Sequence, residues 1–358
     1  MFRGSQVLAA AALWALSAGI AAATPEKYRV SGPVVYENLA IYFVHGASAS
    51  GPVPLTLQEA LANGSAQVHE TGNVNQLEVE NSGDTEVFIQ SGDIVKGGRQ
   101  DRVLTVSLII PPHSGPLPIA SFCVEQGRWT ARGRDDGKNF TTAAAAVPSR
   151  EAKIAMKAPA AAPPKADPSE ALSAYQLSAD VSRRQHEVWN DVAKIQDKLA
   201  RSLDTSVAMP ESRSSLQLSL ENQKLKDAQA AYVKALQPAG EGDGDIVGYV
   251  FTVNGKLNSA DLYPSNGLFR KMWPKLIAAN ATEAIGDKDG AAVPLPSTAD
   301  VLAFLQAAEA GKASEKPLPA GVKLETREAD RALFFETSRA AASPAAPSGW
   351  VHRNYLAK

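Results

Sequence analysis

Two polar clusters, each next to a β-rich stretch, hold most of the side chains in this sequence that could bind a ligand or do chemistry. The first consists of Gly97, Gly98, Arg99, Gln100, Asp101 and Arg102, and the second of Cys123, Glu125, Gln126, Gly127, Arg128 and Trp129. Between them, Val103–Ile110 is largely apolar and rich in β-branched residues, so it is predicted to be a buried strand. The two clusters therefore predict a shallow polar site on a β scaffold.

The first cluster suits an anion. Gly97 and Gly98 can adopt positive φ angles and let a ligand approach backbone N–H groups closely. Arg99 and Arg102 bring guanidinium groups, which recognise phosphate or carboxylate in a bidentate manner, and Gln100 adds an amide. A tight hairpin and an ordinary surface Arg–Asp pair are the alternative interpretations.

The second cluster adds groups that could take part in a reaction. Glu125 and Asp101 are candidate acids or bases, and Arg128 is a candidate anion clamp. Trp129 is either a stacking surface or part of the core. Cys123 is either a reactive thiol or a buried structural one, because a nucleophilic cysteine needs a neighbouring base or positive charge.

Other kinds of site find little support. The five histidines are scattered, with no His-x-His or HExxH motif, so we expect no metal and no cofactor. Gly92–Arg99 matches neither a Walker loop nor a dinucleotide fingerprint, and no Gly-x-Ser-x-Gly elbow supports Ser-His-Asp hydrolysis. Asp261 and His352 are polar residues in otherwise apolar strands, and both are interpreted as partners of structural hydrogen bonds.

Composition narrows the function classes further. The 358 residues include 36 Lys and Arg against 38 Asp and Glu, a formal net charge of −2. This balance argues against a nucleic-acid-binding protein that works by bulk charge. Cys123 is the only cysteine, so no disulfide can form within the chain. The length and the 44% of hydrophobic residues allow one large core or two modest ones.

Residues 1–23 are predicted to be a secretory signal peptide. Arg3 precedes an uncharged stretch, Val7–Ile20, which is followed by Ala21–Ala23. We expect cleavage after Ala23 and a periplasmic or secreted protein without a stable membrane anchor. An uncleaved anchor is disfavoured because the apolar stretch is shorter than the ~20 residues that a spanning helix needs.

Short alternating stretches separated by turn residues predict an antiparallel sandwich or barrel. Tyr36–Val44 is the first predicted strand, and Thr56–Gly64 has the capping-box spacing of a short helix. Asn254-Gly255 lies between two alternating stretches and predicts a hairpin with a type I′ turn. A helical stretch then runs to about Ala284, with a kink or restart expected at Pro274.

These patterns predict an α+β fold: an antiparallel β sandwich or barrel-like core, an inserted helical hairpin, and a C-terminal unit of β-hairpin and helix. Residues 24–141 form the β-rich part and residues 142–168 an Ala/Pro-rich flexible segment, within which Ile154 and Met156 could mark a brief strand. Residues 169–237 form the helical hairpin. Residues 245–358 are expected to pack with 24–141 as one domain.

The order of several segments resembles one known family. Leu55–Ala60, Leu77–Asn81, Gly97–Arg102 and Cys123–Trp129 resemble the domain family named for its association with ADP-ribosylglycohydrolases and rhodanese-phosphatases. The helical pair, Ala260–Leu262 and Leu268–Leu276 also look like that family. The resemblance thus covers nearly all of the chain after the signal peptide.

The resemblance implies a role with ADP-ribose or related phosphoester compounds. Carried over to this chain, the family-typical positions are Gly97–Arg102 and Cys123, Glu125, Gly127, Arg128 and Trp129. We therefore expect an exported domain that binds or hydrolyses a small anionic ligand, with Glu125 or Asp101 as the acid or base if it is an enzyme. The alternative is a non-catalytic envelope protein whose helical pair docks a protein partner.

Overall fold

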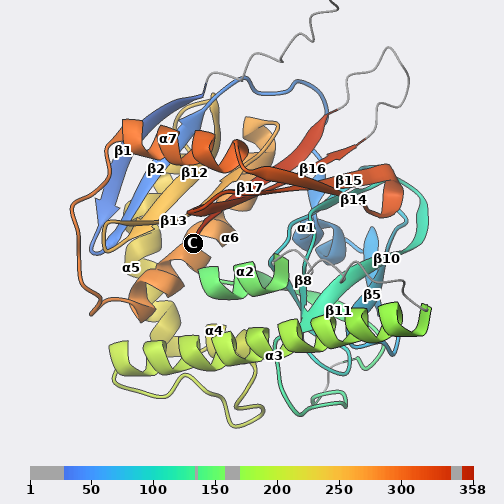
Figure 1. Cartoon of the computed structure of the whole chain (residues 1–358). Coiled ribbons are helices and arrows are strands. Elements are labelled where there is room, and N and C mark those ends of the chain that lie inside the picture. Colours follow the sequence, from blue (N-terminus) through green and yellow to red (C-terminus); the bar gives the residue numbers. More distant parts are fainter. Residues whose placement is uncertain (1–27, 134–135, 158–169, 340–348) are drawn as a thin grey trace, which may run out of the picture.

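The predicted α+β class is confirmed by the structure, a computed structural model that describes residues 28–133, 136–157, 170–339 and 349–358. Antiparallel strands build most of the core, and helices cover them (Figure 1). The predicted signal peptide lies outside the described residues. Within those ranges, none of the helices combines the length and the apolar character needed to cross a membrane.

The largest sheet is antiparallel and combines the beginning and the end of the described chain. Its eight strands follow the order β1-β2-β12-β13-β17-β16-β15-β14. The strands are β1 (Arg29–Tyr36), β2 (Leu39–His45), β12 (Ile246–Val253), β13 (Lys256–Leu262), β14 (Lys312–Pro317), β15 (Val322–Glu328), β16 (Ala332–Arg339) and β17 (Trp350–Ala357). Pairing of β2 with β12 joins the N-terminal strands to the C-terminal ones.

The remaining strands curve into a barrel-like unit. They are β3 (Leu55–Thr56), β4 (Ala66–Glu70), β5 (Gln76–Asn81), β6 (Val87–Ile89), β7 (Asp93–Gly97), β8 (Arg102–Leu104), β9 (Leu108–Ile110), β10 (Ser114–Cys123) and β11 (Phe140–Ala146). A six-stranded sheet has the order β11-β7-β8-β10-β5-β4, and its two edges meet at a bridge between His69 and Asn139. Residues of the three-stranded sheet β3-β6-β9 and of the six-stranded sheet pack in one hydrophobic core.

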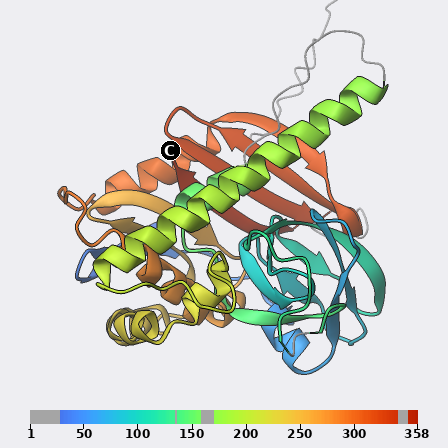
Figure 2. The same ribbon diagram turned by 90° about the horizontal axis from the view of Figure 1, so that it is seen from below.

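Seven helices occur in the described ranges. They are α1 (Leu57–Ala62), α2 (Arg150–Lys157), α3 (Glu170–Ser202), α4 (Leu216–Leu220), α5 (Gln223–Gly240), α6 (Asn266–Gly286) and α7 (Thr298–Glu309), with a short 3-10 turn at Pro319–Gly321. In place of the helical hairpin predicted for residues 169–237, the chain forms three helices, α3, α4 and α5, and both α3 and α5 pack against α6. Seen from below, α3 runs as a long diagonal beneath the molecule and also reaches β10 of the barrel-like unit (Figure 2).

Strand β2 is buried along its whole length because helices cover both faces of the large sheet. Side chains alternate between the faces of a strand. Ile41 and Phe43 pack in the cluster that includes α6, whereas Tyr42 and Val44 pack in the cluster that includes α7. Accordingly, α6 and α7 lie on opposite sides of the sheet (Figure 1).

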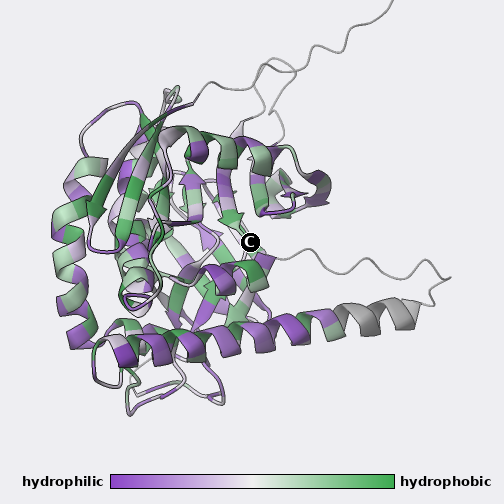
Figure 3. Ribbon diagram, turned by 60° about the vertical axis from the view of Figure 1, so that its left-hand side comes forward, coloured by the Kyte–Doolittle hydropathy of each residue, from purple (hydrophilic) through white to green (hydrophobic). Residues whose placement is uncertain are grey.

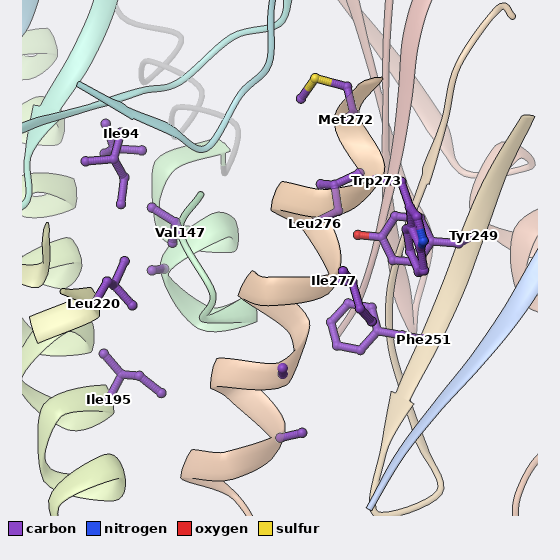
Figure 4. Close-up of a cluster of buried hydrophobic side chains, with 14 of the residues drawn as sticks. Ile94, Val147, Ile195, Leu220, Tyr249, Phe251, Met272, Trp273, Leu276 and Ile277 are labelled. Carbon is purple, nitrogen blue, oxygen red and sulfur yellow. The ribbon is translucent and has the colours of Figure 1, made fainter. Parts of the chain in front are cut away.

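Helix α6 is apolar around much of its circumference, as expected for a helix buried between a sheet and other helices. Trp273 and Ile277 point toward Tyr249 and Phe251 of β12 (Figure 4). By contrast, α3 shows hydrophilic residues over much of its surface (Figure 3). The helix continues through Pro274 as one element, so the expected restart there does not occur.

Three other expectations differ from the structure. The predicted strand Tyr36–Val44 contains a turn at Glu37-Asn38, where Glu37 has a φ of 52°, and the chain folds back there as the β1–β2 hairpin. Residues 142–157 form the end of β11 and helix α2, in place of a flexible segment with a brief strand. Residues 158–169 lie outside the described part.

The third difference concerns the predicted buried strand Val103–Ile110. It is two strands in two sheets, β8 and β9, separated by Thr105–Ser107. Seven of the eight residues are buried, so apolar pattern alone could not reveal the break. Its consequence is that Ser107 leaves the barrel-like sheet and faces the large sheet, with Oγ 3.0 Å from Nδ1 of His352 on β17.

The packing of α5 on α6 gives a test of the core. A Cβ added at Gly240 would overlap the indole of Trp273, whose Nε1 donates a hydrogen bond to the Gln237 carbonyl at 2.9 Å. Overpacking of this kind costs ~1–3 kcal/mol. We expect Gly240→Ala to lower the free energy of unfolding in urea by that amount. Gly244→Ala, where nothing lies within 4 Å of the added Cβ, should change it by less than ~0.5 kcal/mol; equal effects of the two variants would contradict this packing.

Candidate functional site

The two polar clusters lie side by side because β8 pairs with β10. Cys123 is opposite Arg102 in this antiparallel pair. The backbone N–H of Val124 donates to the carbonyl of Asp101 at 3.1 Å, and the amide of Gln100 donates to the carbonyl of Glu125 at 3.2 Å. The turn after β7 and the segment after β10 therefore form one unit at the end of the barrel.

The charges in this unit pair with one another. We call Asp101, Glu125, Arg128 and Arg132 the arginine cluster. Arg128 lies 2.7 Å from Oε2 of Glu125, and Arg132 lies 3.1 Å from Oδ2 of Asp101. Both carboxylates have 0% side-chain exposure, and Ser215 at the start of α4 donates to Oδ2 of Asp101 at 3.0 Å. The guanidinium groups are thus occupied by the protein's own anions.

The two carboxyl groups hold their protons differently. Burial raises the pKa of Asp101 above its ordinary value, although the charge of Arg132 opposes this. Burial also acts to raise the pKa of Glu125, but hydrogen bonds from Arg128 and Ser212 outweigh it, so that pKa is lowered. Glu125 is therefore ionised more readily than Asp101, and both side chains are buried and paired with arginines.

The glycine turn also binds an internal anion. Gly97 and Gly98 have φ angles of 123° and 54°, as expected from their sequence. However, the N–H of Gly97 donates to Oδ1 of Asp101 at 3.1 Å, and the N–H of Gly98 donates to the carbonyl of Asn139 at 3.2 Å. The turn has the predicted conformation, but its N–H groups are already used.

The aromatic residue of the unit supports two arginines. The guanidinium carbons of Arg99 and Arg102 lie 5.4 and 5.5 Å from the ring centre of Trp129, which is 38% exposed. Arg102 is fully buried and lies 3.5 Å from Glu70. Trp129 therefore lies partly exposed against two arginines of its own chain, and its stacking on a ligand stays a prediction.

Cys123 has the environment of a structural thiol. It is 1% exposed, and its backbone exchanges two hydrogen bonds with the side chain of Gln185 on α3, at 2.8 and 2.9 Å. Burial raises the pKa of the thiol to about 11. The thiolate is therefore scarce at neutral pH. Gln126, the last of the predicted residues, is exposed, and its backbone N–H donates to Ser214 at 3.0 Å.

A separate cleft of about 550 Å³ lies between the barrel-like unit and the large sheet. This volume is in the range of small-molecule sites. None of the predicted site residues lines it. Its walls come from Thr105–Ser107, Ser121 and Phe122 of the barrel side, from Phe335, Thr337, His352 and Asn354 of β16 and β17, and from Lys157 and Arg184 of α2 and α3.

Several buried polar atoms in the wall of the cleft lack a hydrogen-bond partner in the described structure. They are Nδ2 of Asn75, Oγ of Ser121, Oγ1 of Thr337 and Nε2 of His352. Ser121, Thr337 and His352 are all at most 3% exposed. Buried polar groups normally have partners, since leaving one unpaired costs ~1–3 kcal/mol. Similar atoms also occur away from the cleft, among them Nε and Nη2 of Arg128.

His352 connects the two halves of the structure at this cleft. Its Nδ1 lies 3.0 Å from Oγ of Ser107, and its Nε2 lies 3.2 Å from Oδ1 of Asp261, off the line of a good hydrogen bond. Asp261 also accepts hydrogen bonds from Asn354 at 2.7 Å and from the hydroxyl of Tyr249 at 3.0 Å. The two polar residues of otherwise apolar strands are thus in contact.

Lys157, at the end of α2, is a cation in the wall of the cleft and has no carboxylate partner. Nζ donates to Oδ1 of Asn354 at 2.6 Å and lies 5.1 Å from the ring centre of Phe335. Among the described residues, no carboxylate lies within 4.0 Å of it. Burial lowers the pKa of Lys157 to about 7, so the ammonium group is poorly stabilised by the protein itself.

One group in the described residues has the donors of a metal site. His45, Asp243 and Asp245 lie close together at the end of β2. Both ring nitrogens of His45 are already bonded, Nδ1 to Asp245 at 2.8 Å and Nε2 to Ser31 at 2.7 Å. We therefore assign it a structural role.

Comparison with known families supports the resemblance seen in the sequence. Residues 27–355 match the model of the ARG and Rhodanese-Phosphatase-superfamily-associated Protein domain. The chain belongs to this family. The matched region includes strands of all three sheets and the seven helices of the described residues, so it covers the barrel-like unit, the large sheet and the cleft between them. Neither a curated protein nor a solved structure matches the chain.

The residues of the cleft were missed for different reasons. Asp261 and His352 stood out as polar residues in apolar strands, and this signal was right about their burial. Ser107 was hidden in a stretch predicted to be one strand, and Lys157 in a stretch predicted to be flexible. Only the pairing of β13, β17 and β16 brings His352 between Asp261 and Thr337.

The arginine cluster predicts a large effect on stability. Removing the guanidinium in Arg128→Ala leaves Glu125 buried and only partly compensated, so we expect the free energy of unfolding to fall by ~3 kcal/mol. Arg183→Ala is the control, because Arg183 pairs with Asp180 and Glu187 on the exposed face of α3. This substitution should lower the free energy of unfolding by less than ~1 kcal/mol. Urea unfolding followed by circular dichroism measures both; a small loss in Arg128→Ala would contradict the structural role.

Proposed function

We propose that the chain binds a small anionic ligand in the cleft between its two β units, with a phosphoester such as ADP-ribose or another nucleotide derivative as the preferred class. One observation carries the proposal: a cleft of small-molecule size is lined by polar side chains, Ser121 and Thr337 among them, and also holds Lys157, a lysine without a carboxylate partner. An anion with several oxygens can accept hydrogen bonds from these groups and compensate the charge.

The proposal moves the ligand from the arginine cluster to the cleft. Arg128 and Arg132 have internal carboxylate partners, and Arg184 in the cleft wall donates to the carbonyl groups of Ala155 and Met156 at the end of α2. Lys157 is left as the cation best placed for a ligand. The predicted signal peptide adds that the ligand would be met in the periplasm or outside the cell.

Binding can be tested by thermal shift and calorimetry with ADP-ribose, nucleotides and sugar phosphates. A ligand at 100 times its Kd adds ~2.7 kcal/mol of stability. Lys157→Met removes the charge and keeps most of the volume, and we expect it to weaken binding by ~10-fold or more, the usual worth of a charge-assisted hydrogen bond. Lys226→Met, on the exposed face of α5, is the control and should bind normally.

Two results would count against the proposal. One is the absence of any shift with the anions. The other is equal affinity of Lys157→Met and the unaltered protein. Arg128→Ala distinguishes the two locations, since it should keep its ligand affinity at temperatures where it is still folded; loss of binding in that folded variant would favour the arginine cluster instead.

The low pKa of Lys157 predicts that binding is linked to protons. Near pH 8 the free protein holds this group mostly uncharged, because burial has lowered its pKa to about 7. A bound anion favours the charged form and raises the pKa. Binding should therefore take up protons, and affinity should fall as pH rises above 7. Calorimetry at pH 8 in buffers of different ionisation enthalpy measures the uptake, which should vanish in Lys157→Met; proton release on binding would contradict the assignment.

A further inference from the structure

A serine and a histidine in the wall of the cleft are in contact, and an aspartate lies behind the histidine. Ser107 Oγ lies 3.0 Å from Nδ1 of His352, and Nε2 of His352 lies 3.2 Å from Oδ1 of Asp261. The three residues come from the break between β8 and β9, from β17 and from β13. Ser107 and His352 both line the cleft, so the contact borders the space available to a ligand.

The hydrogen bonds around Ser107 define the direction of its hydroxyl proton. The backbone N–H of Ser91 donates to Oγ of Ser107 at 3.0 Å. The hydroxyl proton is therefore available for Nδ1 of His352, which must then be the unprotonated nitrogen of a neutral ring. Nε2 carries the other proton and faces Asp261. Asp261 lies 3.2 Å from Nε2, off the line of a good hydrogen bond, so a small rotation of the ring completes the arrangement that activates a serine. The two ring nitrogens have the reverse of their roles in chymotrypsin-type enzymes.

The charge states agree with this geometry. Burial lowers the pKa of His352 below 6.5, although Asp261 opposes it, so the imidazole is an uncharged base at neutral pH. Burial raises the pKa of Asp261, but the hydrogen bond and charge of His352, together with Lys153 and Lys157, bring it to about 2. The aspartate is therefore ionised and can stabilise an imidazolium.

We propose that Ser107, His352 and Asp261 form a hydrolytic triad, and that the cleft takes a carboxylic ester whose alcohol part carries an anionic group. This inference rests on the proposed function, because it places the reaction in the same ligand cleft. Lys157 receives the anion. The acyl group packs on the apolar wall, which includes Phe122, Met156 and Val181.

The reaction balances without a further reactant except water. Ser107 Oγ forms a bond to the acyl carbon while its proton passes to Nδ1 of His352. The ester C–O bond then breaks, and the departing alcohol takes that proton. Water next attacks the acyl carbon and gives a proton to Nδ1; the bond to Ser107 breaks, Oγ regains the proton, and a carboxylic acid leaves. Asp261 stabilises the imidazolium in both halves.

The oxyanion of each step needs hydrogen-bond donors. Nδ2 of Asn75 and the hydroxyl of Ser121 line the same cleft and have no partner in the described structure. A carboxylic ester fits better than direct attack on phosphorus, since phosphoryl transfer gathers more negative charge and usually employs metal ions or several cations, whereas Arg184 is already bonded within the protein.

A fluorophosphonate probe tests the serine directly, because it reacts with an activated serine and leaves a stable adduct. We expect intact-mass spectrometry of the full chain to show one adduct, and peptide mapping to place it on Ser107. Ser107→Ala should abolish the adduct, and His352→Gln should slow labelling by about 100-fold or more, the usual contribution of a general base. Ser219→Ala is the control, since Ser219 is equally buried but bonded to Ser215 and Gln196 away from the cleft.

A second measurement avoids dependence on a variant that could fail to fold. The labelling rate of the unaltered protein should be constant between pH 7 and 9, and should fall only in acid, where His352 becomes protonated, because burial lowers its pKa. A p-nitrophenyl acyl ester should be hydrolysed with the same pH profile, and bis(p-nitrophenyl) phosphate should not. No adduct on the folded protein, an adduct that survives Ser107→Ala, or a rate independent of His352 would each overturn the triad.

The triad and the ligand proposal can fail separately. A thermal shift with phosphoesters but no probe adduct keeps the binding function and removes the triad. An adduct on Ser107 without any shift supports the triad and removes anion binding at Lys157.

Discussion

Antiparallel pairing between strands that are distant in the sequence is the interaction on which the rest of the structure depends. β2 pairs with β12, and β13 pairs with β17, so the first and last strands described belong to one sheet. Helices α6 and α7 then cover its two faces. Because the barrel-like unit is inserted between β2 and β12, it must lie against this sheet, and the cleft forms where the two meet.

The arginine cluster and the cleft differ in whether their cations have carboxylate partners, although Nε of Arg128 and Oε1 of Glu125 also lack a hydrogen-bond partner in the described structure. In the cluster, two carboxylates meet two guanidinium groups, and a serine and a backbone N–H provide further hydrogen bonds. Such a network holds one arrangement of the chain, because removing any member exposes the others to an apolar surrounding. In the cleft, Lys157 and several polar atoms are left incompletely paired. Incomplete pairing is costly for a protein alone and is useful when a ligand completes it.

The sequence allowed the fold class, the hairpin at Asn254-Gly255 and the capped helix at Thr56 to be predicted, because each depends on neighbours along the chain. It also brought the two polar clusters together correctly. It could not show that Arg128 has an internal partner, since ion pairing is decided in three dimensions. The same holds for Ser107, which lies in an apolar stretch, and for Lys157, whose surroundings come from β17. Residues that meet only across sheets leave no spacing pattern to recognise.

The break at Thr105–Ser107 has a consequence for how the molecule comes into being. Ser107 and His352 are 245 positions apart, and neither the barrel-like unit nor the large sheet contains both. During synthesis the serine is made long before the imidazole. A nascent chain, or a fragment cut anywhere between the two, therefore presents a hydroxyl group that has no base beside it. The contact between Ser107 and His352 forms only when the two halves dock, so it is present only in the completely folded chain.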